Sequence, residues 1–232
     1  MAAKLTTIGF DADDTLWENE QFFRMTQEKF TGLLAEFAEP DHLQARLLAA
    51  EKRNLGHYGF GIKGFVLSMI EVAIEVTDQR VPASVIHQLI AAGQDMLQHP
   101  IELLPHAQKA VEQLADSHRI LLITKGDLLD QERKLAQSGL GELFHGVEIL
   151  SHKTPEAYGE IFTRHGDGPA AAMMVGNSLR SDVIPALNAG SWGVFVPHEL
   201  SWALEHDERP DGHDRFHEIT DLGKLGDLVS GL

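Results

Sequence analysis

The chain has 232 residues and a formal net charge of −16, from 35 acidic and 19 basic side chains, and it contains no cysteine. This charge argues against a nucleic acid or an anionic membrane as the main partner, and the lack of cysteine excludes disulfides, thiolate metal sites and cysteine nucleophiles. Because the sequence shows no charged-then-apolar leader and no apolar run of about 18 residues, we expect a soluble cytoplasmic protein.

The first predicted element is a strand, Leu5–Phe10, which ends at an acidic pair. Side chains alternate along a strand, so Asp11 and Asp13 should project to the same side just beyond its end. Two carboxylates this close repel each other and need a shared cation or a shared proton. Asp13, Asp14 and Thr15 are also typical helix-capping residues. We favour a functional site for the pair and assign capping to Asp14, which has the opposite parity.

Between residues 17 and 100 the pattern is helical, with no convincing buried strand. Four segments have the apolar spacing of helices, namely 18–38, 42–53, 63–76 and 82–97. The stretch between the second and third segments, residues 54–64, is rich in glycine and aromatic residues and is expected to form an ordered loop. An insert of this length is too long for a loop and indicates a separate helical subdomain.

From about residue 105 onward, helices and strands alternate. The predicted helices are 107–118, 127–140, 155–166 and 181–190, and the predicted strands are 119–124, 147–151, 171–176 and 192–197. Alternation with fully apolar strands predicts a parallel sheet that is covered on both faces. We therefore predict an α/β fold with a Rossmann-like parallel sheet core, residues 1–16 and 101–232, and an all-helical cap subdomain, residues 17–100, inserted after the first strand.

In open parallel sheets, ligands bind beyond the carboxyl ends of the strands. The side chains that follow the predicted strands are Asp11, Asp13, Thr124, Lys125, Lys153, Asn177, Ser178 and, one turn further on, Asp182. Carboxylate oxygens are good ligands for Mg²⁺, and ammonium and hydroxyl groups bind phosphate oxygens. The set therefore suits a phosphoryl group together with a hard divalent cation.

These segments resemble the motifs of the haloacid dehalogenase-like (HAD) hydrolase superfamily, in particular its phosphatases with a helical C1 cap. FDADDTLW is similar to the Asp-x-Asp-x-Thr motif, ITKGD to the threonine motif, HKTPEAYGEIF to the lysine motif and VGNSLRSDV to the acidic fourth motif. The four motifs follow one another in the family order across nearly the whole chain, which makes the signal far more specific than any one of them.

The resemblance implies a Mg²⁺-dependent phosphatase that hydrolyses a small phosphorylated metabolite through an aspartyl-phosphate. Asp11 would be the nucleophile, and Asp13 would be the general acid and then the general base. The Asp11 carboxylate, the Asp13 backbone carbonyl and Asp182 would hold Mg²⁺. The phosphoryl oxygens would be bound by Thr124, Lys125 and Lys153.

The chain departs from the family pattern at Asn177, where many members carry aspartate. Asn177 removes one negative charge from the metal site. It is expected to lie behind the metal ligands, where it would orient a metal-bound water or form a hydrogen bond with Lys153. In the predicted cap, Tyr58 and Lys63 are candidate substrate contacts, although packing of Tyr58 between helices and a solvated Lys63 explain the same residues equally well.

Three alternatives share parts of this pattern. A 2-haloacid dehalogenase of the same superfamily keeps the nucleophilic aspartate but has no carboxylate at the position of Asp13 and uses no metal. A receiver-type domain needs a phosphorylatable aspartate after a strand in a region that is helical here. A non-catalytic phosphate-binding protein does not need the whole set of side chains. The pattern identifies neither the individual substrate nor an oligomeric state.

Overall fold

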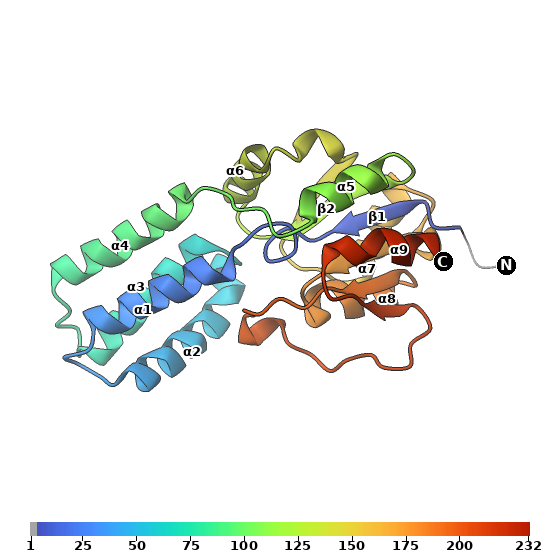
Figure 1. Ribbon diagram of the computed structural model, residues 1–232. Coiled ribbons are helices and arrows are strands. Elements are labelled where there is room, and N and C mark those ends of the chain that lie inside the picture. Colours follow the sequence, from blue (N-terminus) through green and yellow to red (C-terminus); the bar gives the residue numbers. More distant parts are fainter. Residues whose placement is uncertain (1–3) are drawn as a thin grey trace. The chain divides into compact units, whose positions relative to one another are not determined.

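The computed structural model describes residues 4–232 (Figure 1). It divides into two compact units. The sheet unit consists of the chain up to Asn19, Ile101–Lys125 and Gln131–Leu232, and the helical unit consists of Glu20–Pro100 and Gly126–Asp130. None of the helices in the described part of the chain combines the length and the apolar character that crossing a membrane requires.

The sheet unit is built on six parallel strands in the order β3-β2-β1-β4-β5-β6. Their bounds are β1 Thr7–Phe10, β2 Arg119–Lys125, β3 Gly146–Leu150, β4 Ala172–Gly176, β5 Trp192–Phe195 and β6 Phe216–Glu218. The helical segment lies between β1 and β2 in the sequence. The prediction of an α/β fold with a parallel sheet and an inserted helical segment is therefore confirmed.

Helices cover both faces of this sheet because successive residues of the strands point to opposite sides. In β2, Ile120 and Leu122 belong to the core that contains side chains of α5 and α9, whereas Leu121 and Ile123 pack in the core that contains α7 and α8. The helices of this part are α5 Ala107–Ala115, α7 Pro155–His165, α8 Ile184–Asn188 and α9 Leu225–Ser230, together with α6 Leu128–Ser138 from Gln131 onward. A run of apolar residues in β2 is thus explained by burial on two sides.

The helical unit has a hydrophobic core of its own. Its helices are α1 Glu20–Leu33, α2 Pro40–Tyr58, α3 Ile62–Val76 and α4 Ala83–Gln98. Apolar residues three or four positions apart form one face of each helix, and these faces pack together. Fully or almost fully buried members are Phe30, Leu34, Leu43, Leu47, Phe65, Met69, Val72 and Leu89.

The expectation of an ordered loop over residues 54–64 is wrong in extent, because only three residues separate α2 from α3. Asn54 is buried in α2 and donates a hydrogen bond to Ser68 Oγ of α3 at 3.2 Å. This packing of helix on helix outweighs the weak helix propensity of the glycines in the segment. The turn itself uses Gly59 (φ 71°) and Gly61 (φ 115°), in backbone conformations that favour glycine.

No strand or α-helix was predicted after residue 197, and the structure has a strand and an α-helix there. β6 extends the sheet at one edge, and α9 packs on the same face as α5. β6 has only three residues and α9 only six. Elements this short carry too few residues for a periodic pattern to be recognised.

The central strand gives a test of the fold. Ile8 of β1 is fully buried in the core shared with α5 and α9. Replacement Ile8→Ala should lower the free energy of unfolding by about 2–5 kcal/mol, because it removes buried methyl groups and leaves a cavity. Urea denaturation measures the change. The control Leu129→Ala removes a side chain that is 70% exposed and should stay within about 0.5 kcal/mol of wild type. Equal losses for both variants would contradict the assigned core.

Candidate active site

The register of the central strands brings the predicted site residues to one edge of the sheet. Phe10 at the end of β1 pairs with Leu122 of β2 and with Val175 of β4. The backbone N–H of Asp11 donates to the Val175 carbonyl at 2.9 Å. Thr124 lies two residues beyond Leu122, and it is almost completely buried. The first, second and fourth motifs, at the ends of β1, β2 and β4, therefore start side by side.

A buried lysine connects two of the predicted carboxylates. Lys153, three residues after β3, donates to Asp11 Oδ1 at 2.5 Å and to Asp182 Oδ1 at 2.6 Å. Its side chain is 1% exposed, and that of Asp182 is fully buried. Buried charges are tolerated only when they are paired and hydrogen-bonded. Two carboxylates share this one ammonium group, so the cluster carries an excess negative charge.

This pairing sets the ionisation of the cluster. Burial raises the pKa of Asp11 to about 7, the charge of Asp182 raises it as well, and Lys153 opposes both effects. Burial alone would lower the pKa of Lys153, but the two carboxylates outweigh it and raise that pKa above its usual range. Lys153 therefore remains a cation in the buried cluster.

The segment after β4 fixes Asp182. Asp182 Oδ2 accepts a hydrogen bond from the backbone N–H of Ser178 at 2.9 Å. Ser178 is the N-cap of a π-helix, Leu179–Val183, that contains Asp182 and continues into α8. A Cβ at Gly176 would lie 2.2 Å from Asp182 Oδ2, so only glycine allows this approach. Tyr158 of α7 is fully buried and donates to the Ser181 carbonyl at 3.0 Å, which joins the π-helix to α7.

Asn177 faces the oxygens that the sequence assigned to a metal. Its side-chain amide lies 3.2 Å from Asp11 Oδ2, from the Asp13 carbonyl oxygen and from Thr15 Oγ1, and the amide nitrogen is the end that satisfies all three. The backbone N–H of Asn177 also donates to Thr15 Oγ1 at 3.0 Å. Asn177 thus lies against Asp11 and Asp13, whereas the two oxygens of Asp182 accept from Lys153 and Ser178.

This donor set fits a hard divalent cation. A carboxylate oxygen of Asp11 and a backbone carbonyl oxygen of Asp13 converge on one amide, and an amide can present its own oxygen when it turns. Oxygen donors of this kind are those that Mg²⁺ prefers. The excess negative charge around Lys153 would also be balanced by a cation.

The side chain of Asp13 has partners that the sequence analysis did not identify. Its carboxylate accepts hydrogen bonds from Trp17 Nε1 at 2.8 Å, from Gln131 Nε2 at 2.8 Å and from Lys134 Nζ at 2.9 Å. Gln131 and Lys134 lie in α6, more than a hundred residues away in the sequence. Gln131 and Lys134 are three residues apart, so they lie on the same face of the helix. This spacing is visible in the sequence, but it does not indicate that the face contacts Asp13.

Lys125, predicted to bind phosphate, is engaged by an acidic residue. Its Nζ donates to Ser181 Oγ at 2.7 Å and to Glu205 Oε1 at 2.5 Å. Glu205 also accepts from the hydroxyls of Ser178 and Ser181, at 2.6 and 2.5 Å. Burial would raise the pKa of Glu205, but the charge and hydrogen bond of Lys125 outweigh it and lower that pKa. This network links the end of β2 to the segment after β5.

The two predicted cap residues lie in the helical unit. Tyr58 is 51% exposed at the end of α2. Lys63 Nζ donates to both carboxylate oxygens of Asp127 at 2.9 Å, and this hydrogen bond lowers the pKa of Asp127 despite partial burial. Asp127 belongs to the helical unit as well. The assignment of Tyr58 and Lys63 to substrate contacts stays a prediction.

Asp14, which the sequence analysis assigned to helix capping, bonds to the backbone just ahead of α1. Its backbone is in the left-handed region (φ 57°), and Oδ1 accepts a hydrogen bond from the N–H of Asn19, the residue before α1. His198, after β5, lies 3.9 Å from the same carboxylate through Nδ1. Asp14 therefore stabilises the turn that leads from the site into α1.

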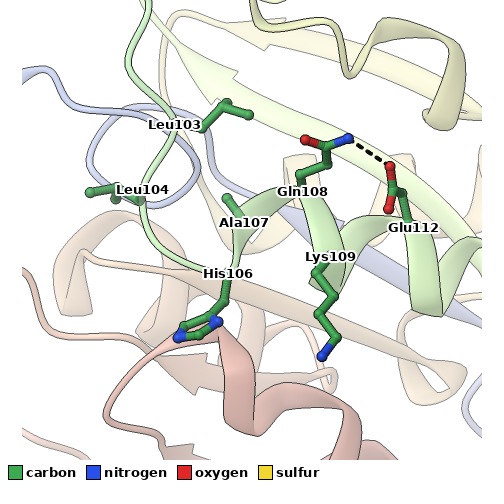
Figure 2. A pocket seen from close by; sticks show the side chains of 7 residues that line it. All are labelled: Leu103, Leu104, His106, Ala107, Gln108, Lys109 and Glu112. Atoms are coloured by element: carbon green, nitrogen blue, oxygen red, sulfur yellow. Dashed lines mark hydrogen bonds between the residues drawn. The ribbon is translucent and has the colours of Figure 1, made fainter.

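A surface cavity of about 380 Å³ lies elsewhere in the sheet unit. Figure 2 shows its lining, with Gln108 donating to Glu112 at 2.8 Å across one wall. The lining residues are Leu103, Leu104, His106, Ala107, Gln108, Lys109 and Glu112. None of the predicted site residues is among them, so the strand ends and not this cavity remain the candidate site.

Comparison with known proteins places this geometry in a family. A model of haloacid dehalogenase-like hydrolases matches residues 5–190. A glyceraldehyde 3-phosphate phosphatase from Methanothermobacter thermautotrophicus is 25% identical over 97% of this chain and 100% of its own length.

Solved structures extend the comparison to the fold. A haloacid dehalogenase-like hydrolase from Xanthomonas campestris is 39% identical, with a TM-score of 0.87 over 98% of this chain and 91% of its own. The hydrolase YfnB from Bacillus subtilis, solved with bound magnesium, shares the fold at 14% identity and a TM-score of 0.67 over 97% of this chain and 99% of its own. Structures of 2-haloacid dehalogenases share it too, so the fold by itself does not select the reaction.

The network around Lys125 gives a test that depends on pH. Replacement Glu205→Gln should lower the free energy of unfolding at pH 7 by about 1–3 kcal/mol, because hydrogen bonds to a charged group are lost. Since the folded-state pKa of Glu205 is lowered, its contribution is present above the usual value of 4.5 and is lost as the pH falls below it. Urea denaturation at pH 7, 5 and 3.5 should show the difference from wild type shrinking as the pH falls. The exposed neighbour Glu208 provides the control Glu208→Gln, and a difference that is independent of pH would contradict the pairing.

Proposed function

The chain belongs to the haloacid dehalogenase-like hydrolase family, and on this premise we propose that it is a Mg²⁺-dependent phosphatase that hydrolyses a small phosphorylated metabolite. The observation that carries the proposal is the geometry at the end of β1. Asp11 is held by Lys153, and a second carboxylate, Asp13, follows two residues later with its own set of donors. One carboxylate is thus available to attack and a second to move a proton.

In the first half of the proposed reaction, a carboxylate oxygen of Asp11 forms a bond to phosphorus. The bond from phosphorus to the leaving oxygen breaks, and the proton of Asp13 moves to that oxygen. Thr124 and Lys153 lie at the ends of the neighbouring strands, and their hydroxyl and ammonium groups would bind the phosphoryl oxygens. Lys125 would join them only if it released Glu205, so we give it a weaker part in phosphate binding.

In the second half, a water molecule attacks phosphorus and Asp13 takes its proton. The bond between phosphorus and Asp11 then breaks, which releases inorganic phosphate and restores the Asp11 carboxylate and the protonated Asp13. Asp13 therefore has to exchange one proton with the leaving oxygen and one with water. The same side chain serves both steps because hydrogen bonds from Trp17, Gln131 and Lys134 hold its carboxylate in one place.

The Asp11 carboxylate and the Asp13 carbonyl would hold Mg²⁺, with Asn177 turned so that its amide oxygen faces the ion. When bound, the cation supplies positive charge that offsets repulsion between the Asp11 carboxylate and the phosphate. Asp182, predicted as a ligand, has its oxygens on Lys153 and Ser178. We therefore give Asp182 the task of orienting Lys153, with direct contact to the metal as the alternative.

The chemistry of the site and the name of one relative support the proposed substrate class. We propose that residues 17–100 form a cap that selects the substrate, with Tyr58 and Lys63 as candidate contacts. Triose phosphates belong at the head of a substrate panel, because the relative that is 25% identical is named as a glyceraldehyde 3-phosphate phosphatase. The net charge of −16 disfavours nucleic acids and anionic membranes as partners.

The first activity test concerns the nucleophile. Replacement Asp11→Asn should reduce phosphatase turnover at least about a thousandfold, because an amide cannot form the phosphorylated intermediate. Initial rates on a panel of phosphate esters with Mg²⁺ measure the loss, and circular dichroism checks the fold. The control Asp116→Asn makes the same chemical change at an exposed position at the end of α5. A folded Asp11→Asn variant with wild-type rates, or a wild type that dehalogenates 2-haloacids and hydrolyses no phosphate ester, would refute the proposal.

The second activity test concerns the metal. A chelator should abolish turnover and Mg²⁺ should restore it. Replacement Asn177→Asp should tighten Mg²⁺ binding, since it adds an anionic oxygen beside Asp11 and the Asp13 carbonyl. Isothermal titration calorimetry with Mg²⁺ alone measures the affinity without relying on activity. Asn188→Asp, at an exposed position at the end of α8, is the matched control. Full activity without any divalent cation would remove the metal from the proposal.

A further inference from the structure

The carboxylate of Asp13 is fully surrounded by donors. Oδ1 accepts from Trp17 Nε1 at 2.8 Å and from Lys134 Nζ at 2.9 Å, and Oδ2 accepts from Gln131 Nε2 at 2.8 Å and from Lys134 Nζ at 3.1 Å. A carboxylate has about four acceptor positions. All four are used, so the side chain has one strongly preferred orientation.

Lys134 is committed to this carboxylate. Its side chain is 7% exposed, less than that of Asp13 at 22%. Its ammonium group has three hydrogens, and the structure gives them three acceptors, the two oxygens of Asp13 and Asn19 Oδ1 at 2.8 Å. Lysine is rarely buried, because its charge must be paired when it leaves water. Burying an apolar side chain at this position would cost less free energy than burying an ammonium group. The positive charge of Lys134 therefore needs an explanation.

The neighbouring cation on the same helix behaves differently. Arg133 is less buried than Lys134, and its guanidinium donates to Gln137 Oε1 on the next turn of α6 at 3.2 Å. Gln131 lies on the face of Lys134 and donates both to Asp13 and to the Lys125 carbonyl. One face of α6 is thus directed at the site, while Arg133 has a local partner.

We propose that Lys134 is a positioning residue for Asp13 in the phosphatase reaction, with Gln131 as its partner. The inference rests on the proposed function, because it concerns the side chain that moves the proton. Lys134 holds the carboxylate in the place where proton transfer occurs and supplies the positive charge that attracts it once its proton has gone to the leaving oxygen.

Gln131 has the chemistry to accompany both states of Asp13. Its Nε2 donates to Asp13 Oδ2, as it would to an ionised carboxylate. Its Oε1 is buried and has no hydrogen-bond partner among residues 4–232. A turn of the amide would offer this oxygen to a protonated Asp13, which Lys134 cannot do because an ammonium group only donates. Lys134 can therefore form a hydrogen bond only to the acceptor oxygens of Asp13. Gln131 can donate to an ionised Asp13 and accept from a protonated one.

The test compares five proteins with the wild type: Lys134→Met, Lys134→Arg, Arg133→Met, Asp13→Ala and the double variant Asp13→Ala with Lys134→Met. Each is assayed on 4-nitrophenyl phosphate, which has a good leaving group, and on glycerol phosphate, which needs its leaving oxygen protonated. Lys134→Met should lower kcat for glycerol phosphate by about 10- to 100-fold, part of the 10²–10⁴-fold that general acid–base catalysis provides. The loss for 4-nitrophenyl phosphate should be much smaller, and KM should change little for either ester.

The double variant decides whether Lys134 acts through Asp13. In the Asp13→Ala background, Lys134→Met should cause no further loss, because the group that it positions is already absent. Lys134→Arg should recover part of kcat, and Arg133→Met should match wild type. The same loss for both esters, or an equal further loss in the double variant, would show that Lys134 only stabilises the fold and would overturn the inference.

Thermal unfolding of each variant separates folding from catalysis. If Lys134→Met does not fold, Gln131→Leu replaces it in the same design, because it removes one donor to Asp13 and keeps the ammonium group. Its pattern across the two esters should be the same and its size smaller, and a uniform loss would again overturn the inference. An inactive wild type would refute the proposed function itself. An active wild type with a uniform loss in Lys134→Met would refute only the role of Lys134.

Discussion

Lys153 carries a buried positive charge into the space between two buried carboxylates, and the arrangement of the strand ends depends on it. Asp11 follows β1, Asp182 lies in the π-helix after β4, and Lys153 follows β3 on the far side of β2. The sheet brings the segments that carry these three groups close together. The hydrogen bonds of Lys153 then fix the orientation of the side chains. Their attraction offsets the cost of burying each charge, so removal of one would leave the others without compensation.

The two aspartates of the first motif, Asp11 and Asp13, lie in different environments. Asp11 is buried, shares its ammonium group with Asp182, and has its pKa raised to about 7. Asp13 is partly exposed and has four hydrogen bonds of its own, two of them from Lys134. Two chemically identical side chains, two positions apart, thus receive different partners from different parts of the chain. This difference in partners gives a physical basis for different tasks.

The sequence predicted the parts of the site that depend on local pattern. Apolar strands followed by polar residues predicted a shared site for Asp11, Thr124, Lys153 and Asp182, because parallel strands end at one edge. The structure joins Asp11, Lys153 and Asp182 by hydrogen bonds. The sequence did not reveal Lys134 and Glu205, since a helix face and a late loop acquire meaning only when the chain has folded. The α2–α3 turn was predicted too long, because glycine content was weighed without the buried bond from Asn54 to Ser68. β6 and α9 were too short to show a period.

Asn177 contacts both aspartates of the first motif. Its amide gives a donor to Asp11 Oδ2 and to the Asp13 carbonyl, two oxygens that lie close together at the end of β1. An aspartate there would add a further negative oxygen to a cluster in which Asp11 and Asp182 already share one lysine. The asparagine therefore lowers repulsion within the protein, at the expense of one charged ligand for a cation. The affinity of this site for a cation therefore depends on the number of carboxylates relative to lysines, and not on the fold alone.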